Sequence, residues 1–200
     1  MSRTPIFLLS AWLAGSCAAT EALSREAVHD LAEASSDGPV RLTLRGTEVV
    51  SSSVPVSRAG LPERVRTMIE AIAPGGTTLR LSRERGPLGE GYRVEKDLGN
   101  GDFRAMLIAP DGSVLERSHA VPLGEVPQQV LLAATAPGRI DVRRCEIVSD
   151  GARETGWRIL VLDGAGRAYS CECSLDGDLL SRSRILDAEI SCALPAVSGG

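Results

Sequence analysis

Residues 111–118 read DGSVLERS, and residues 176–183, which lie 65 positions further along the chain, read DGDLLSRS. An Asp-Gly pair favours a tight hairpin turn, and the residues that follow it in each stretch predict a strand. The same offset aligns GYRV at 91–94 with GWRI at 156–159. It also aligns LPERV at 61–65 with VPQQV at 126–130. The chain therefore contains an internal repeat of about 65 residues.

Each copy of the repeat is predicted to hold one helix followed by four strands. The helices begin near Pro62 and Pro127 and run to an Ala-Pro-Gly at 73–75 and 136–138, signals typical of helix starts and stops. Loops rich in Gly and Asp between the strands indicate antiparallel meanders. The sequence therefore predicts an α+β fold of tandem units, each with one helix packed on a four-stranded antiparallel meander sheet. The predicted strands are 77–82, 92–98, 102–109 and 113–118 in the first copy, and 140–149, 157–162, 168–174 and 178–183 in the second.

Fainter similarity extends the repeat toward the N-terminus, because residues 46–53 fall on 111–118 at the same offset. This organisation predicts five segments. They are a signal peptide with a lipobox at 1–17, a truncated unit of one helix and a hairpin at 18–58, a first full unit at 59–122, a second full unit at 123–188 and a tail at 189–200.

The N-terminus resembles an export signal. A basic start at Arg3 precedes the apolar stretch 6–14, which is too short to cross a bilayer as a helix. Residues 13–17, LAGSC, are similar to the lipobox of bacterial lipoproteins, in which the cysteine is lipidated. We therefore expect an exported protein of the periplasm or cell envelope, attached to the membrane through lipid on Cys17. The alternative is ordinary cleavage after Ala18 or Ala19 with loss of that cysteine.

Composition excludes two broad classes. The 200 residues are 43% hydrophobic and 24% charged, which is typical of globular proteins and not of disordered chains. The formal charge of −4 gives no sign of the excess of Lys and Arg that binds the phosphates of nucleic acids, so we expect no nucleic-acid partner.

No pattern in the sequence indicates catalysis. No nucleophile elbow accompanies His29 or His119, and the glycine-rich segments 99–101 and 164–166 each lie between two predicted strands, where phosphate loops do not occur. We therefore predict a protein that is not an enzyme and that uses no cofactor and no metal.

The cysteines allow two interpretations. Cys171 and Cys173 share one face of a strand and align with Met106 and Ile108, which predicts burial under the helix. Structural thiols or disulfides are therefore expected at Cys145, Cys171, Cys173 and Cys192, with Cys145 better placed to reach Cys192 than its strand neighbours. The alternative is a redox or metal site that uses Cys145, Cys171 and Cys173.

The repeat resembles a known family. Residues 121–130 (VPLGEVPQQV) and 111–115 (DGSVL) carry a resemblance to PepSY and PepSY-like domains, which extends over about residues 59–188. The resemblance implies a small non-catalytic module of the kind associated with peptidase propeptides, with proposed protease inhibition and a fold similar to a beta-lactamase inhibitor protein.

These observations together predict an exported, non-enzymatic protein that binds or inhibits another envelope protein, such as a peptidase. The sheet face opposite the helix is the expected contact surface, and its arginines would pair with acidic groups of the partner. The candidate contact residues are Arg93, Arg158, Arg104, Arg143 and Arg144. Alternatives are an envelope redox or metal-binding protein and a structural spacer.

Overall fold

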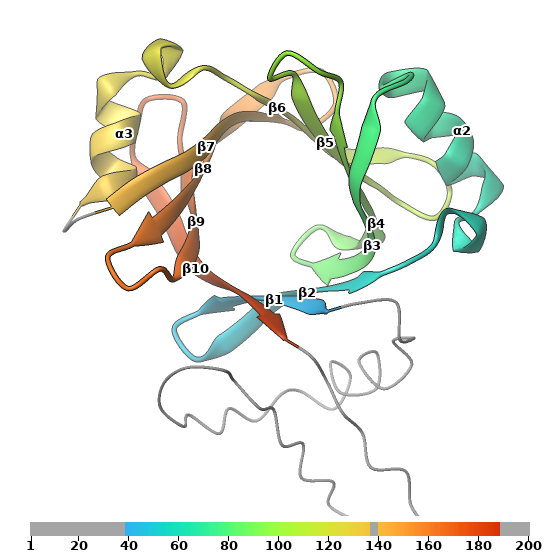
Figure 1. The fold of residues 1–200 in the computed structure, drawn as a ribbon, viewed down its shortest axis with the longest axis horizontal. Helices are drawn as coiled ribbons and strands as arrows, with labels where there is room; N and C mark the ends of the chain where they lie inside the picture. The colour runs from blue at the N-terminus through green and yellow to red at the C-terminus, as the bar shows by residue number, and fades with distance from the viewer. Residues whose placement is uncertain (1–38, 137–139, 189–200) are drawn as a thin grey trace, which may run out of the picture.

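The computed structural model describes residues 39–136 and 140–188, which form a closed antiparallel barrel with two α-helices on its outside (Figure 1). The helices are α2 (Glu63–Ile72) and α3 (Gln128–Thr135), each preceded by a short 3-10 turn, η1 (Arg58–Gly60) or η2 (Leu123–Glu125). The strands are β1 (Val40–Arg45), β2 (Glu48–Pro55), β3 (Thr77–Gly86), β4 (Gly89–Asp97), β5 (Phe103–Ile108), β6 (Val114–Ala120), β7 (Ile140–Ser149), β8 (Glu154–Asp163), β9 (Ala168–Cys173) and β10 (Leu179–Ala188).

Every strand pairs with its neighbours in sequence, and β1 pairs with β10 to close the barrel. The closing register runs from Val40 opposite Ala188 to Leu44 opposite Arg184. Helix α2 lies in the connection from β2 to β3, and α3 lies in the connection from β6 to β7. No helix in the described part of the chain is both long enough and apolar enough to span a membrane.

The predicted fold of tandem α+β units is wrong. The two sets of four strands do not form separate sheets, because β6 pairs with β7 and the N-terminal hairpin β1–β2 joins β3 to β10. A separate four-stranded sheet would leave two edges of unpaired N–H and C=O groups, whereas a closed barrel leaves none. The predicted signal peptide, the helix of the truncated unit and the tail lie outside the described residues.

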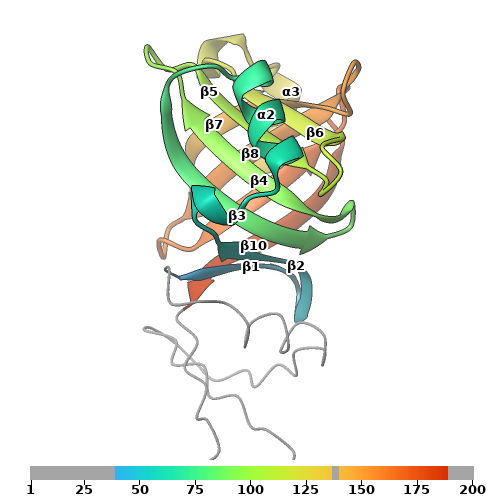
Figure 2. The same cartoon turned by 90° about the vertical axis from the view of Figure 1, so that its right-hand side faces the viewer.

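Two of the three apolar clusters in the described residues lie between a helix and the outer wall of the barrel, and the third is formed by β1, β2 and β10. Figure 2 shows α2 running across the outside of the strands. Side chains of α3 pack on β7, β8 and β9, and those of α2 pack on β4 and β5. The buried members are Val130, Ala134, Cys145, Ile159, Val161, Cys171 and Cys173 around α3, and Val65, Ile69, Val94, Met106 and Ile108 around α2.

Side chains alternate between the two faces of a strand, so the second face of each strand lines the interior of the barrel. In β8, for example, Ile159 and Val161 belong to the outer core, while Arg158 and Leu160 line a central cavity. The face that we expected to be an open contact surface is therefore the wall of a lumen.

Two local features hold the elements in place. The chain's single lysine, Lys96, is buried on the outer face of β4 and donates a hydrogen bond to the carbonyl oxygen of Ala73, which ends α2. Gly156 permits the close approach of β8 and β9, since a Cβ there would lie 2.4 Å from the carbonyl oxygen of Cys173.

Candidate binding site in the barrel lumen

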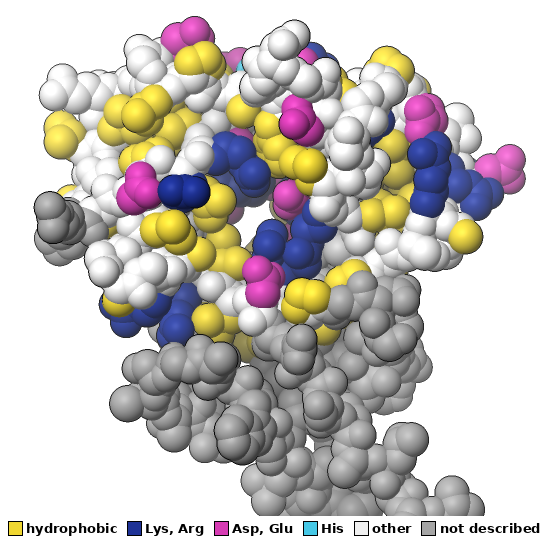
Figure 3. Space-filling model, viewed as in Figure 1, with side chains coloured by type: hydrophobic (Ala, Val, Ile, Leu, Met, Phe, Trp, Pro, Cys, Tyr) yellow, Lys and Arg dark blue, Asp and Glu magenta, His cyan; other side chains and the backbone are white. Residues whose placement is uncertain are grey.

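The barrel contains a cavity of about 460 Å³ that is open to the surface, and this volume is typical of small-molecule sites. Figure 3 shows the molecule hollowed at its centre, with basic and acidic side chains around the opening. Both signs of charge line the cavity. The charged lining residues are Arg41, Arg45, Arg80, Arg93, Arg144, Arg158, Glu84, Glu95, Glu116, Glu146 and Glu172.

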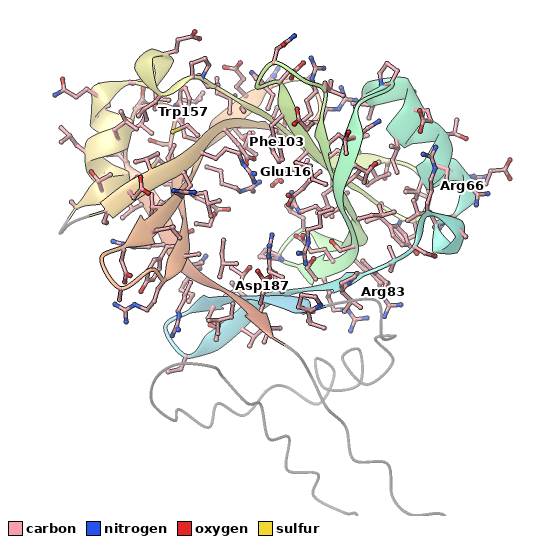
Figure 4. All side chains as sticks on the ribbon, viewed as in Figure 1. Arg66, Arg83, Phe103, Glu116, Trp157 and Asp187 are labelled. Carbon is pink, nitrogen blue, oxygen red and sulfur yellow. The ribbon has the colours of Figure 1, made fainter. Side chains whose placement is uncertain are left out.

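Glu116 is the centre of the charge network. Its Oε1 accepts hydrogen bonds from Nη1 of Arg93 at 3.0 Å and from Nη1 of Arg158 at 2.9 Å, and its Oε2 accepts one from Nη2 of Arg158 at 2.8 Å. Figure 4 shows Glu116 inside the barrel. The two arginines are the residues that the 65-residue offset aligns with each other, so equivalent positions of the two copies converge on one carboxylate.

Electrostatics hold Glu116 in its charged form. Burial alone raises the pKa of its carboxyl group, but the hydrogen bonds and charges of Arg158 and Arg93 outweigh burial and lower that pKa to about 2. Burial lowers the pKa of Arg93, and the charges of Glu84 and Glu116 more than reverse this. All three groups therefore stay charged at neutral pH.

Further ion pairs extend the network around the lumen. Nε of Arg93 lies 2.5 Å from Glu84, and Nη2 of Arg158 lies 3.6 Å from Glu172. A separate set comprises Nε of Arg144, which donates to Glu146 at 2.5 Å, and Ser118 Oγ, which donates to the same carboxylate at 2.6 Å. The guanidinium of Arg144 also stacks 3.7 Å above the ring of Phe103.

Arg80 differs from the other arginines of this network. Among the described residues, no carboxylate oxygen lies within 4.0 Å of its guanidinium nitrogens, and its hydrogen bonds go from Nη2 to Oγ of Ser53 at 3.3 Å and to the carbonyl oxygen of Ser53 at 3.5 Å. Burial lowers the pKa of Arg80 and the nearby charge of Arg41 lowers it further, while the charges of Glu95, Asp187 and Glu84 offset only part of this shift. The guanidinium of Arg80 has five N–H donors, and most of them have no acceptor among the described residues.

The structure separates the five arginines that the sequence placed on one contact surface. Arg93, Arg144 and Arg158 line the lumen and are engaged in ion pairs. Arg104 and Arg143 lie on exposed parts of the barrel, where each pairs with an aspartate two residues away. The five residues therefore do not share one surface. The sequence did not identify Glu116 or Arg80 as candidate site residues. Glu116 lies in a predicted strand, so side-chain alternation could have placed it on the same sheet face as Arg93 and Arg158.

The three described cysteines are buried free thiols. Cys145, Cys171 and Cys173 are unpaired, and their burial against α3 raises the pKa of each thiol, that of Cys173 to about 11. The described residues contain no group of three or more His, Cys, Asp or Glu side chains arranged to hold a metal. Cys17 and Cys192, and with them the expected lipid anchor and disulfide, lie outside the described residues.

In the native protein these three thiols are expected to react slowly with alkylating agents at pH 8. They are buried, and their raised pKa leaves little of the reactive thiolate form. Iodoacetamide labelling followed by peptide mapping checks this residue by residue, with labelling in urea as the control. Rapid native labelling of Cys171 or Cys173 would instead support the redox alternative.

No known family model matches the chain, and no curated protein matches it. Several solved structures are similar in part. They include a Bacteroides eggerthii protein provisionally described as periplasmic (18% identity, TM-score 0.46), a DUF2874 family protein from Bacteroides uniformis (16%, 0.44) and a BLIP-like protein from Bacteroides fragilis (15%, 0.42). The first two matches cover 62% of this chain and 88% of the other, and the third covers 68% and 94%. A BLIP-like protein is thus among the structures that this chain resembles, the PepSY assignment stays a prediction, and none of the three assigns a role to a residue here.

Proposed function

We propose that this chain is an exported, non-enzymatic protein that binds another protein of the cell envelope. The leader at residues 1–17 supports export. The observation that carries the binding proposal is a pair of exposed leucines at the lumen, Leu88 and Leu180, which we call the leucine rim. They line the same cavity and expose 52% and 67% of their surface.

The leucine rim is presented by two hairpins. Leu88 lies in the turn between β3 and β4, and Leu180 lies at the start of β10, directly after the β9–β10 loop. Leu175 and Leu179 of the same β9–β10 segment are also exposed. Large apolar side chains that gather on exposed turns are typical of protein contact sites, and they supply the apolar centre that such interfaces need.

The interior supports a binding role more than catalysis. The charges of Arg93 and Arg158 are balanced by those of Glu84 and Glu116, and the described thiols are buried. The resemblance to PepSY domains favours a peptidase as the partner, with inhibition as the consequence of binding.

Leu180→Arg is expected to weaken capture of the envelope partner at least about tenfold, because a charge would replace an apolar anchor of the contact. The measurement is affinity capture from an envelope extract, followed by titration with the purified partner. Leu132→Arg is the matched control, since Leu132 is 60% exposed on α3 and does not line the lumen. Equal affinity of the two variants would remove the leucine rim from the proposal, and a wild-type protein that captures nothing would favour the structural spacer.

A further inference from the structure

The two halves of the barrel place an arginine at matching points, but among the described residues only the arginine of the second half, Arg144, forms an ion pair. Arg80 of β3 stands opposite Glu95 of β4, and Arg144 of β7 stands opposite Leu160 of β8. Glu95 and Leu160 are themselves 65 positions apart. Arg80 and Arg144 therefore occupy equivalent places in the lumen.

The residue two positions beyond each arginine differs between the halves. After Arg144 this residue is Glu146, which accepts hydrogen bonds from Arg144 and from Ser118. After Arg80 it is Ser82, which is fully buried and accepts a hydrogen bond from Ser53 at 2.8 Å. A pair of serines thus stands where the second half has a serine and a carboxylate. Among the described residues, the guanidinium of Arg80 therefore has no carboxylate within ion-pair distance, although Glu95, Asp187 and Glu84 lie near enough to attract it.

A second positive group lies near Arg80. Arg41 is close enough for its charge to lower the pKa of Arg80, and its own acidic partners are Asp187 at 2.8 Å and Glu95 at 4.0 Å. An anion bound at Arg80 would reduce the repulsion between the two guanidinium groups. It could also accept two parallel hydrogen bonds from the planar guanidinium of Arg80.

The remainder of the lining limits the ligand further. Leu107, Leu160 and Ile185 line the same cavity and offer an apolar surface, while Glu84, Glu95 and Glu116 would repel a second negative charge. We propose that the lumen binds a small organic monocarboxylate, whose carboxylate pairs with Arg80 and whose apolar body lies against these aliphatic side chains. The leucine rim lines the same cavity, but the residues proposed to hold the ligand do not include Leu88 or Leu180. The ligand proposal therefore does not depend on the proposed protein partner.

Isothermal titration with benzoate and with hexanoate tests the proposal. The Arg80→Gln variant is expected to bind both acids at least about tenfold more weakly than the wild type, since it loses a charge-assisted pair. The matched control is Arg83→Gln on the same strand, whose side chain lies outside the barrel (Figure 4) and is absent from the cavity lining, so its affinity should change less than about twofold.

A second variant keeps the test valid if Arg80→Gln does not fold. Ser82→Glu supplies from within the chain the carboxylate that the second half has in Glu146, so it should pair with Arg80, raise the midpoint of thermal unfolding and abolish binding of both acids. Inorganic phosphate should bind the wild type more weakly than benzoate, because its second charge meets the lumen glutamates. Failure of the wild type to bind either acid at millimolar concentration, or equal affinity of wild type and Ser82→Glu, would overturn the proposal. Neither result would affect the test of the leucine rim.

Discussion

Replacing Glu116 with glutamine is expected to lower the free energy of unfolding at pH 7 by about 3 kcal/mol, the lower end of the range for breaking a buried ion pair from one side. The substitution leaves Arg93 and Arg158 in the lumen without their shared counter-charge. The carboxylate and both guanidinium groups are less than one-fifth exposed, so solvent cannot replace the lost partner. Urea denaturation of the two proteins measures the difference.

The same carboxylate makes wild-type stability depend on pH. The pKa of Glu116 falls from the ordinary 4.5 to about 2 in the folded protein, so the unfolded chain takes up the proton more readily than the folded one. The stabilisation is therefore complete above about pH 5 and is lost as the pH falls toward 2. The difference in the free energy of unfolding between the wild type and Glu116→Gln should therefore shrink as the pH falls from about 5, and it should vanish near pH 2.

Glu90→Gln is the control for this experiment. Glu90 also pairs with arginines, Arg83 and Arg85, but it is 40% exposed at the β3–β4 turn. Exposed pairs contribute less than about 1 kcal/mol, so this variant should resemble the wild type at every pH. If Glu116→Gln were as stable as Glu90→Gln at pH 7, the shared carboxylate would not stabilise the barrel.

The local elements of the fold could be predicted from the sequence, but their closure into a barrel could not. The predicted strand at 140–149 is confirmed as β7, and the helical segment that begins near Pro62 is confirmed as α2. The alternation of side chains along a strand shows which residues share a face of the sheet. It does not show that the sheet curves so that its polar face lines the interior of a barrel. Closure also depends on pairing between residues as distant as Val40 and Ala188, for which the sequence contains no local signal.

The candidate site was predictable in part for a similar reason. The offset of 65 correctly singled out Arg93 and Arg158 as an equivalent pair, but their common partner Glu116 is present in only one copy, since residue 181 is serine. The equivalence of Arg80 and Arg144 is hidden, because β3 and β7 match at an offset of 64 and not 65. Only the strand register shows that these two arginines correspond.

Ile159→Ala is expected to lower the free energy of unfolding by about 2 to 5 kcal/mol, because the substitution leaves a cavity in the core between α3 and the barrel wall. Ile159 has no exposed surface, and its neighbours across β7 and β9 are Cys145 and Cys171. Urea denaturation gives the magnitude, and Ile159→Val should show a smaller loss of about 1 kcal/mol. Leu132→Ala, on the exposed side of α3, should change stability by less than about 0.5 kcal/mol.

The pH dependence of these losses separates the two sources of stability. A cavity in an apolar core changes no charge, so the loss caused by Ile159→Ala should be equal at pH 7 and at pH 3, whereas that of Glu116→Gln should fall with the pH. If the loss for Ile159→Ala also disappeared in acid, or did not exceed that of Leu132→Ala, the packing of α3 on the wall would not be an independent stabiliser. The barrel would then depend mainly on the ion pairs of its lumen, which is the reverse of what the burial of Ile159 predicts.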